Sequence, residues 1–462
     1  MFNREVYINR RQQVKTAVQT GMILILGNEE SSMNYKDNHY HFRQDSNFLY
    51  FAGLDRANLA LVIDIDNNKE TVFGDDGSID DIIWTGPLET LPSQAAKAGI
   101  NDTASNKSLA DVLAKAVNDK RPIHFTPPYR AENAQKISAF LNIPLSNVKE
   151  NASVTLIKAI IALRSIKSAE EVAEIEKAVS ITTDMHLTAM RNARPGMTEN
   201  ELAGQIHGLA LSKGGNIAFP IILTVNGQIL HNHSQGNVLK EGMMVLCDSG
   251  AENSMRYGGD MTRTFPVGKT FTSRQKDLYN IVLNAHKAAV EALRPGVFYK
   301  DVHLLACEKL VDGLSAVGLM KGNAKEAVAA GAHAMFFQCG LGHMLGLDTH
   351  DMEDLGEEYV GYTDTFKKSK EFGLKSLRLG RQLETGFVLT VEPGIYIIPE
   401  LIDMWKAENK HTEFINYDVL ETYKDFGGIR IEEDFLITET GKKLLGSPIA
   451  KTVEEVESER QA

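Results

Sequence analysis

The chain has 462 residues, with 49 Lys and Arg against 61 Asp and Glu, and its formal net charge is −12. Because a single hydrophobic core stops growing at roughly 250–300 residues, we expect two domains. The composition, 43% hydrophobic and 24% charged, is that of globular proteins and excludes general disorder. The acidic excess excludes non-specific binding to nucleic acid or an anionic membrane, since both require a positive potential.

The sequence also carries signals about its compartment. No apolar run approaches the ~20 residues of a membrane span. No apolar segment follows the charged N-terminal residues, as it would in a signal peptide. The three cysteines are few and odd in number, so the sequence predicts no disulfide framework. This cysteine usage indicates a reducing compartment. We therefore expect a cytoplasmic protein.

The first third of the chain has the pattern of an α/β domain, which we place at residues 1–160. Apolar runs predict strands at Met22–Leu26, Ala60–Ile65 and Ile123–Thr126. Helical periodicity predicts helices at Ala110–Val117 and Ala131–Leu141.

A second domain is expected over residues 161–450. The segment Ser168–Glu171 has the S-x-x-E form of a capping box and predicts the start of a helix. Residues 451–462 form a charged segment, which we expect to be a loosely ordered tail.

The second domain contains a weak internal repeat. A helical stretch ends at Arg194-Pro195-Gly196, and another ends 100 residues later at Arg294-Pro295-Gly296. A further capping box, Thr198–Glu201, follows the first tripeptide. The pattern fits a duplicated helix–turn–helix unit as well as a coincidence of two common helix stops.

Four predicted strands of this domain each carry or adjoin an acidic residue. They are Met243–Cys247 before Asp248, Tyr257–Val267 around Asp260, Phe387–Ile398 around Glu392, and Gly428–Thr438 around Glu432. A carboxylate among apolar strand residues is costly unless it is paired or coordinates a cation. Strand alternation places Thr262 on the face of Asp260, and Arg430 on the face of Glu432. One side of a sheet is therefore expected to gather acids, hydroxyls and an arginine.

The glycine-rich segment Cys339–Gly346 adds a histidine, His343, and His350 follows closely. Four carboxylates and an imidazole suit two divalent cations such as Mn²⁺, Co²⁺ or Zn²⁺. Two such cations would balance the four negative charges. They would also acidify a bridging water to hydroxide, which is the nucleophile of two-metal hydrolysis.

At these positions the sequence resembles the Xaa-Pro peptidases of the pita-bread fold, the family of prolidase (Xaa-Pro dipeptidase) and aminopeptidase P. The segment Arg43–Gly53 resembles the family's N-terminal signature, and Leu163–Ser168 resembles its linker. Five motifs match the family's metal-ligand positions in order: Cys247–Gly250, Gly259–Arg263, Gly342-His343, Thr390–Gly394 and Arg430–Glu432. The resemblance implies an α/β N-terminal domain, which serves oligomerisation and covers the substrate pocket. It also implies an α+β pita-bread catalytic domain like that of creatinase and methionine aminopeptidase, and a homodimer.

The resemblance also assigns roles. Asp260 and Glu432 would bridge two metals, Asp248 would complete one, and His343 with Glu392 would complete the other. His231 and His350 would lie in the substrate pocket and stabilise the oxyanion. Glu392 would shuttle a proton to the leaving proline nitrogen. Arg430 would hold Glu432 by charge pairing.

Two long segments, Glu353–Arg378 and Ile402–Phe426, resemble those of prolidases, in which an arginine matching Arg378 binds the substrate carboxylate. We therefore expect a metal-dependent exopeptidase, a hydrolase that acts on Xaa-Pro dipeptides. Aminopeptidase P, acting on longer proline-containing peptides, is the alternative. A non-catalytic binding module and a metal-free hydrolase of the same fold are disfavoured because all five ligand positions are retained. The sequence departs from the family at Cys339, where histidine is common, and this affects the pocket on the proline side.

Overall fold

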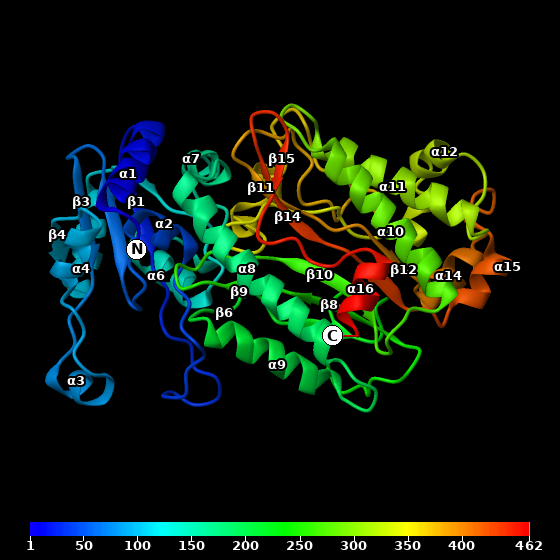
Figure 1. The fold of residues 1–462 in the computed structure, drawn as a ribbon. Coiled ribbons are helices and arrows are strands. Elements are labelled where there is room, and N and C mark those ends of the chain that lie inside the picture. The colour runs from blue at the N-terminus through cyan, green and yellow to red at the C-terminus, as the bar shows by residue number, and fades with distance from the viewer. Residues whose placement is uncertain (462) are drawn as a thin grey trace. The chain divides into compact units, whose positions relative to one another are not determined.

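The computed structural model describes residues 1–461, which form two compact units. The first unit comprises Met1–Arg164 with Asp354–Tyr359, and the second comprises Ser165–Glu353 and the chain from Val360 onward. The ribbon in Figure 1 shows the elements of both units. All residues proposed for chemistry from the sequence lie in the second unit.

The first unit is built on a five-stranded mixed sheet with the order β4-β3-β2-β1-β5. The strand β1 pairs antiparallel with β2 and parallel with β5. The strands are β1 (Met22–Leu26), β2 (Ala60–Asp64), β3 (Lys69–Phe73), β4 (Asp102–Ala104) and β5 (Ile123–His124). The three predicted strands are thus present, two of them shorter than expected.

Both faces of this sheet are covered, since consecutive side chains of β1 are buried and successive strand residues point to opposite faces. Leu24 belongs to a core cluster with Leu113 of α5, while Ile23 on the opposite face is also fully buried. The helices are α1 (Arg4–Val18), α2 (Ser46–Ala52), α3 (Ile79–Thr85), α4 (Leu91–Lys97), α5 (Leu109–Asn118), α6 (Ala131–Leu141) and α7 (Val154–Ser165).

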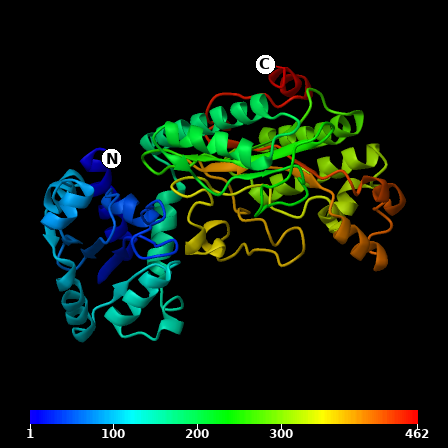
Figure 2. The same ribbon diagram turned by 90° about the horizontal axis from the view of Figure 1, so that it is seen from below.

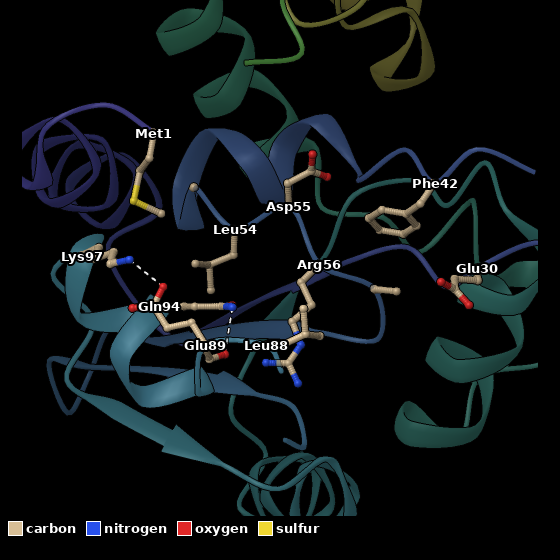
Figure 3. A pocket seen from close by; sticks show the side chains of 12 residues that line it. Met1, Glu30, Phe42, Leu54, Asp55, Arg56, Leu88, Glu89, Gln94 and Lys97 are labelled. Carbon is tan, nitrogen blue, oxygen red and sulfur yellow. Dashed lines mark hydrogen bonds and ion pairs between the residues drawn. The ribbon is translucent and has the colours of Figure 1, made fainter. Parts of the chain in front are cut away.

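A hollow of about 450 Å³ lies in the first unit (Figure 3). Two ion pairs border it: Lys97 with Glu89 at 2.5 Å, and Arg56 with Asp76 at 3.3 Å. Its charged side chains are therefore largely matched by opposite charges at the surface.

The second unit contains the predicted helix–turn–helix unit twice. The helices α8 (Ala169–Asn192) and α9 (Glu199–Ser212) form one copy, and α10 (Ser273–Ala292) and α11 (Tyr299–Ala316) form the other. Both turns place a glycine in the left-handed region, Gly196 at φ 94° and Gly296 at φ 87°. Both glycines donate an equivalent backbone hydrogen bond of 2.8 Å, to Leu239 and Leu383 respectively. The matching geometry favours duplication over coincidence.

The capping boxes predicted at Ser168 and Thr198 are both formed. The shorter helices of the second unit are α12 (Ala324–Ala329), α14 (Pro399–Ala407), α15 (Tyr417–Leu420) and α16 (Val453–Glu459), whereas α13 (Glu357–Val360) lies almost entirely in the segment assigned to the first unit.

The acid-bearing strands do not form the single sheet face expected from the sequence. They belong to three small sheets, with the orders β10-β8-β7, β11-β14-β15 and β12-β13, and a further pair is β6-β9. The strands are β6 (Asn216–Ile217), β7 (Ile222–Thr224), β8 (Met244–Ser249), β9 (Ala251–Glu252), β10 (Met261–Pro266), β11 (Val388–Val391), β12 (Gly394–Tyr396), β13 (Gly428–Arg430), β14 (Glu433–Ile437) and β15 (Lys442–Leu444).

Two of the predicted strands are interrupted at the residues singled out for chemistry. The first breaks at Glu392-Pro393, because proline has no N–H to continue a ladder. The second breaks at Ile431-Glu432, and β10 begins only after Asp260. An isolated bridge between Thr262 and Glu432 connects two of the sheets. The long green helices α8 to α10 lie along one side of these strands, whereas the orange helices α14 and α15 lie beyond their end (Figure 2).

The expectation of a loosely ordered tail is wrong. Residues after 452 form α16, which begins with a capping box and buries Val453 and Val456. The guanidinium of Arg460 then donates to the carbonyls of Pro266 and Ala193. These contacts fix the end of the chain on the second unit. Among residues 1–461, no helix combines the length and the apolar character needed to cross a membrane.

Candidate active site

A cavity of about 650 Å³ in the second unit collects nearly all the residues proposed from the sequence. Nine of the ten line it: His231, Asp248, Asp260, His343, His350, Arg378, Glu392, Arg430 and Glu432. The tenth, Thr262, lies behind Glu432 and donates to its carboxylate at 2.7 Å.

The breaks between strands carry these side chains to one place. Asp260 immediately precedes β10, Glu392 immediately follows β11, and Glu432 lies between β13 and β14. His343 is brought alongside by a bridge between Met344 and Leu389 of β11. Gly342 allows this approach, since a Cβ there would lie 2.1 Å from the carbonyl oxygen of Thr390.

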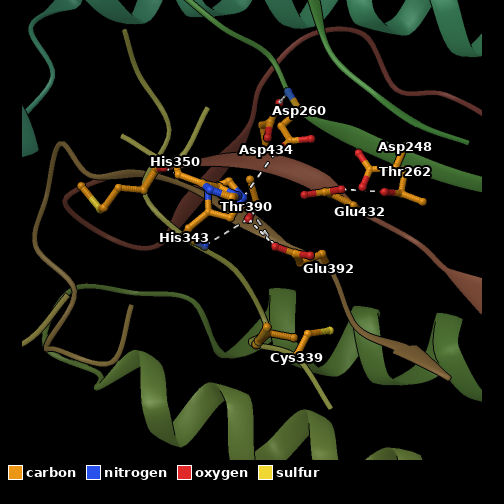
Figure 4. Close-up of polar contacts among 12 residues, drawn as sticks. Asp248, Asp260, Thr262, Cys339, His343, His350, Thr390, Glu392, Glu432 and Asp434 are labelled. Atoms are coloured by element: carbon orange, nitrogen blue, oxygen red, sulfur yellow. Dashed lines mark hydrogen bonds and ion pairs between the residues drawn. The ribbon is translucent and has the colours of Figure 1, made fainter. Parts of the chain in front are cut away.

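The side chains of Asp260, His343 and Glu432 each offer a ligand atom, and these atoms lie within 4.8 Å of one another. The Nε2 atom of His343 is 3.3 Å from Asp260 Oδ2 and 3.5 Å from Glu392 Oε1. Figure 4 shows these groups around a common space, with Cys339 set apart from the carboxylates. This spacing suits residues that share cations.

The ring of His343 is oriented from behind. Its Nδ1 lies 3.0 Å from the carbonyl oxygen of Met344, so Nδ1 is the nitrogen that carries hydrogen in the neutral ring. The Nε2 atom then faces the acids with its lone pair, as in metal-binding histidines. Burial lowers the pKa of His343, but the hydrogen bond to Asp260 and the charge of Glu392 outweigh it and raise the pKa to about 9. The site therefore attracts positive charge to this nitrogen.

The buried carboxylates are short of compensating charge. Burial and the neighbouring acids raise the pKa of Asp248 and Glu392, and raise that of Glu432 well above its ordinary value. The Oδ1 atoms of Asp248 and Asp260 are buried and find no hydrogen-bond partner among residues 1–461. Divalent cations would satisfy these oxygens and neutralise the repulsion, so the residues present fit the two metals expected from the sequence.

Arg430 makes contacts that differ from those expected. Its direct ion pair is with Asp248, through Nη2, and it reaches Glu432 only through Thr262. The Oγ1 atom of Thr262 accepts a hydrogen bond of 3.0 Å from Arg430 Nε and donates its own to Glu432. Arg430 Nη1 also donates to the hydroxyl of Tyr396 at 2.8 Å. The guanidinium therefore orients two carboxylates from behind the centre.

His350 and Arg378 are joined by Glu353, which sequence reasoning missed. Glu353 Oε2 lies 2.8 Å from His350 Nδ1, and Oε1 accepts from Arg378 at 2.6 Å. The hydrogen bond to His350 and the charge of Arg378 lower the pKa of Glu353 to about 2, against a smaller effect of burial. The rings of His350 and His343 lie 4.4 Å apart, so this group adjoins the carboxylate cluster.

Asp434 was also missed. Its Oδ2 accepts the backbone N–H of Asp260 at 3.0 Å, and burial with the charge of Asp260 raises its pKa well above the usual range. The sequence could have indicated Asp434, because strand alternation places it on the same face as Glu432. The same alternation places Thr390 on the face of Glu392, and the Oγ1 atom of Thr390 lies 3.4 Å from Glu392 Oε1.

Sequence comparison identifies the family. Residues 173–439 match metallopeptidase family M24, and residues 7–124 match the aminopeptidase P N-terminal domain. The chain is 32% identical to the Xaa-Pro dipeptidase of Homo sapiens, over 97% of this chain and 90% of that protein. It is 30% identical to the Xaa-Pro aminopeptidase of Escherichia coli strain K12, over 99% of this chain and 97% of that protein.

Structural comparison agrees with the sequence. Aminopeptidase P from E. coli with the inhibitor Pro-Leu superposes with a TM-score of 0.81 at 30% identity, covering 100% of this chain and 98% of that one. The chain therefore belongs to metallopeptidase family M24, and it is a hydrolase with a pita-bread catalytic domain that binds divalent metal. The fold class and the resemblance inferred from the sequence are confirmed.

Proposed function

We propose that the chain is an exopeptidase that hydrolyses Xaa-Pro bonds, and that it acts as an Xaa-Pro dipeptidase. One observation carries the proposal. Four carboxylates and an imidazole from segments far apart in the chain line one cavity together with three further histidines and two arginines. The relatives named Xaa-Pro dipeptidase and Xaa-Pro aminopeptidase support the substrate class.

Two divalent ions, Mn²⁺ by preference and Co²⁺ or Zn²⁺ as alternatives, would be held by the five residues predicted as ligands. Asp260 and Glu432 would bridge the ions, Asp248 would serve one, and His343 with Glu392 the other. Bound cations supply Lewis acidity, which lowers the pKa of a water molecule and polarises the scissile carbonyl.

The remaining polar residues would bind and orient the substrate. His231 and His350 line the cavity and can donate to the carbonyl oxygen as negative charge develops on it. Glu392 would accept a proton from the attacking water and deliver it to the proline nitrogen, which has no hydrogen of its own in the peptide bond. Thr390 lies within reach of Glu392 and would hold its carboxylate in place.

Arg378 would bind the free carboxylate of a dipeptide. It lines the same cavity, and its pairing with Glu353 fixes the guanidinium beside His350. A guanidinium that binds the C-terminal carboxylate directly after the proline residue favours dipeptides over longer peptides. If Arg378 has no such role, the same centre would suit an aminopeptidase acting on longer peptides.

We further propose a cytoplasmic homodimer. The helix α3 supports an association through the first unit, because its apolar side chains are exposed. Ile79 is 69% exposed, Ile83 71% and Trp84 86%. Exposed apolar residues gathered on one helix are typical of contact surfaces between proteins.

The purified protein should contain divalent metal and release proline from Xaa-Pro dipeptides when supplied with Mn²⁺. Parallel assays with Xaa-Pro dipeptides and with longer Xaa-Pro peptides separate the two activities. Turnover of dipeptides supports the dipeptidase, whereas turnover of longer peptides alone assigns an aminopeptidase. A metal-loaded protein that turns over neither peptide would refute the peptidase proposal.

Arg378→Ala tests the substrate clamp. It should raise KM for dipeptides much more than it lowers kcat, because the lost contact is made to bound substrate. Lys375→Ala, which removes an exposed basic residue three positions away, is the matched control. Equal kinetics of the two variants would remove Arg378 from the substrate site.

A further inference from the structure

A second group of potential metal ligands lies away from the carboxylates. His303 and Cys307 are one turn apart on α11, so they occupy the same face of the helix. His333 reaches them from the 3₁₀-helix Ala332–Met335. One ligand atom from each of the three lies within 4.8 Å of the other two.

The three side chains are buried, at 0% exposure for His303 and Cys307 and 2% for His333. Their polar atoms are poorly satisfied: His303 Nδ1 and both ring nitrogens of His333 lack a hydrogen bond of good geometry within residues 1–461. Leaving buried donors and acceptors unpaired is costly, and such groups in a native core call for a partner. The cluster therefore has capacity for a partner that the described residues do not supply.

The distances suit a tetrahedral ion. Cys307 Sγ lies 3.5 Å from His303 Nε2. Zinc bonds of about 2.3 Å to sulfur and about 2.0 Å to nitrogen, at a tetrahedral angle, separate those two ligands by about 3.5 Å. The carbonyl of Val328 lies near the ring of His333 and raises its pKa against the larger effect of burial. One nitrogen of His333 can thus face this carbonyl while the other faces the cluster, as ligating histidines commonly do.

We propose that His303, Cys307 and His333 form a separate metal site that takes one thiophilic divalent ion, with Zn²⁺ as the best fit. A thiolate and two imidazoles are softer than the carboxylates of the active site, so the two sites select different ions. The thiol of Cys307 loses its proton to solvent when the ion binds. The site is independent of the proposed peptidase activity and does not rely on it.

A bound ion would have a structural consequence. An ion at the cluster would tie α11 to Ala332–Met335, directly before the segment that carries His343. It would therefore stiffen the wall behind the cavity.

The test uses the full-length protein and Co²⁺ as a spectroscopic probe. The carboxylate site offers only oxygen and nitrogen donors, so a thiolate-to-cobalt charge-transfer band can arise only at a cysteine. Cys339→Ala and Cys247→Ala are matched controls, because these are the other two cysteines of the chain. We expect the band in the wild-type protein and in both controls, with the intensity of one thiolate-bound Co²⁺ per chain, and its loss in Cys307→Ala. Added Zn²⁺ should abolish the band.

A wild-type protein without the band would overturn the proposal, and so would a band that survives in Cys307→Ala. Should Cys307→Ala fail to fold, His333→Gln serves instead, because it keeps the thiol and removes a ligand. We expect His333→Gln to need more than about tenfold more Co²⁺ to reach half the band. An unchanged titration in that variant would exclude His333 as a ligand and refute the site as proposed.

Discussion

Glu432 and Glu433 are neighbours in the chain, and each is only 1% exposed, yet their surroundings are opposite. Glu432 faces the cavity, where its closest hydrogen-bond donor is the hydroxyl of Thr262. Burial and the charges of Asp260 and Glu392 raise its pKa well above the ordinary value. Within residues 1–461 this carboxylate makes no ion pair, and the charge of Arg430 offsets only part of the rise in its pKa.

Glu433 points to the other side and is fully compensated. It lies 2.7 Å from Arg263 Nη2 and 2.8 Å from Lys451 Nζ, with His286 at 3.8 Å. Burial alone would raise its pKa, but Arg263 and the other cations lower it below the usual range. The two glutamates are therefore equally buried, and they differ in whether cationic side chains compensate the charge of the carboxylate.

The difference separates a structural buried charge from a functional one. A carboxylate that serves the fold comes with its counter-ion from the same chain, because an unpaired buried charge is costly. Glu432, the predicted bridging ligand, makes no such ion pair among residues 1–461, so the cation that compensates it must come from outside the chain. Exchanging each glutamate for glutamine tests this interpretation, because glutamine has almost the same shape as glutamate but carries no charge.

Glu433→Gln should destabilise the fold by about 3–5 kcal/mol, because it leaves Arg263 buried without its counter-charge. Chemical denaturation of the metal-free protein measures the change in the free energy of unfolding. Molecules that remain folded should bind metal normally, since the carboxylate faces away from the cavity. A stability equal to that of the wild type would show that Arg263 does not need Glu433.

Glu432→Gln should show the reverse pattern. Losing an orienting residue costs about 10–100-fold in metal affinity or activity, so losing a bridging ligand should lower kcat/KM by more than about 100-fold. The metal-free protein should be as stable as the wild type or more so, since one repelling charge is gone. Activity within a few-fold of wild type, or a large loss of metal-free stability, would contradict the assignment of Glu432 as a ligand.

Removing metal should destabilise the wild-type protein, and restoring it should reverse the effect. At free Mn²⁺ ten times the dissociation constant of a site, binding stabilises the folded state by about 1.4 kcal/mol for that site. Glu433→Gln should retain this gain, and Glu432→Gln should lose most of it. Thermal unfolding with and without Mn²⁺, after treatment with a chelator, measures both. Equal stabilisation of the two variants by Mn²⁺ would contradict the assignment of Glu432 as a metal ligand and Glu433 as a structural residue.

The sequence predicted local structure well where one segment decides it. The capping boxes at Ser168 and Thr198 and the strand Met22–Leu26 are formed as expected. The long predicted strands around Glu392 and Glu432 were not, because apolar content alone does not reveal a break. Pro393 was a readable signal for the first break, whereas the second depends on the bridge from Glu432 to Thr262 across 170 residues.

The site was predicted through motifs that name ligand positions, and these residues do line one cavity. The groups that orient them escaped notice because their role is set by tertiary contacts. Glu353 contacts Arg378, which lies 25 residues further along the chain, and Arg430 pairs with Asp248 rather than with the glutamate two residues away. Nothing in the run Glu432-Glu433-Asp434 tells which acid has a cation beside it.

Lys451→Met is expected to have the smallest effect. The side chain of Lys451 is 31% exposed, and partly exposed ion pairs contribute about 0–1 kcal/mol. Arg263, whose side chain is fully buried, would still compensate Glu433 in this variant. Denaturation of Lys451→Met, alone and combined with Glu433→Gln, measures how the two cations share the carboxylate. A loss as large as that of Glu433→Gln would mean that Lys451 is the essential partner, and that burial of the cation does not determine its importance to Glu433.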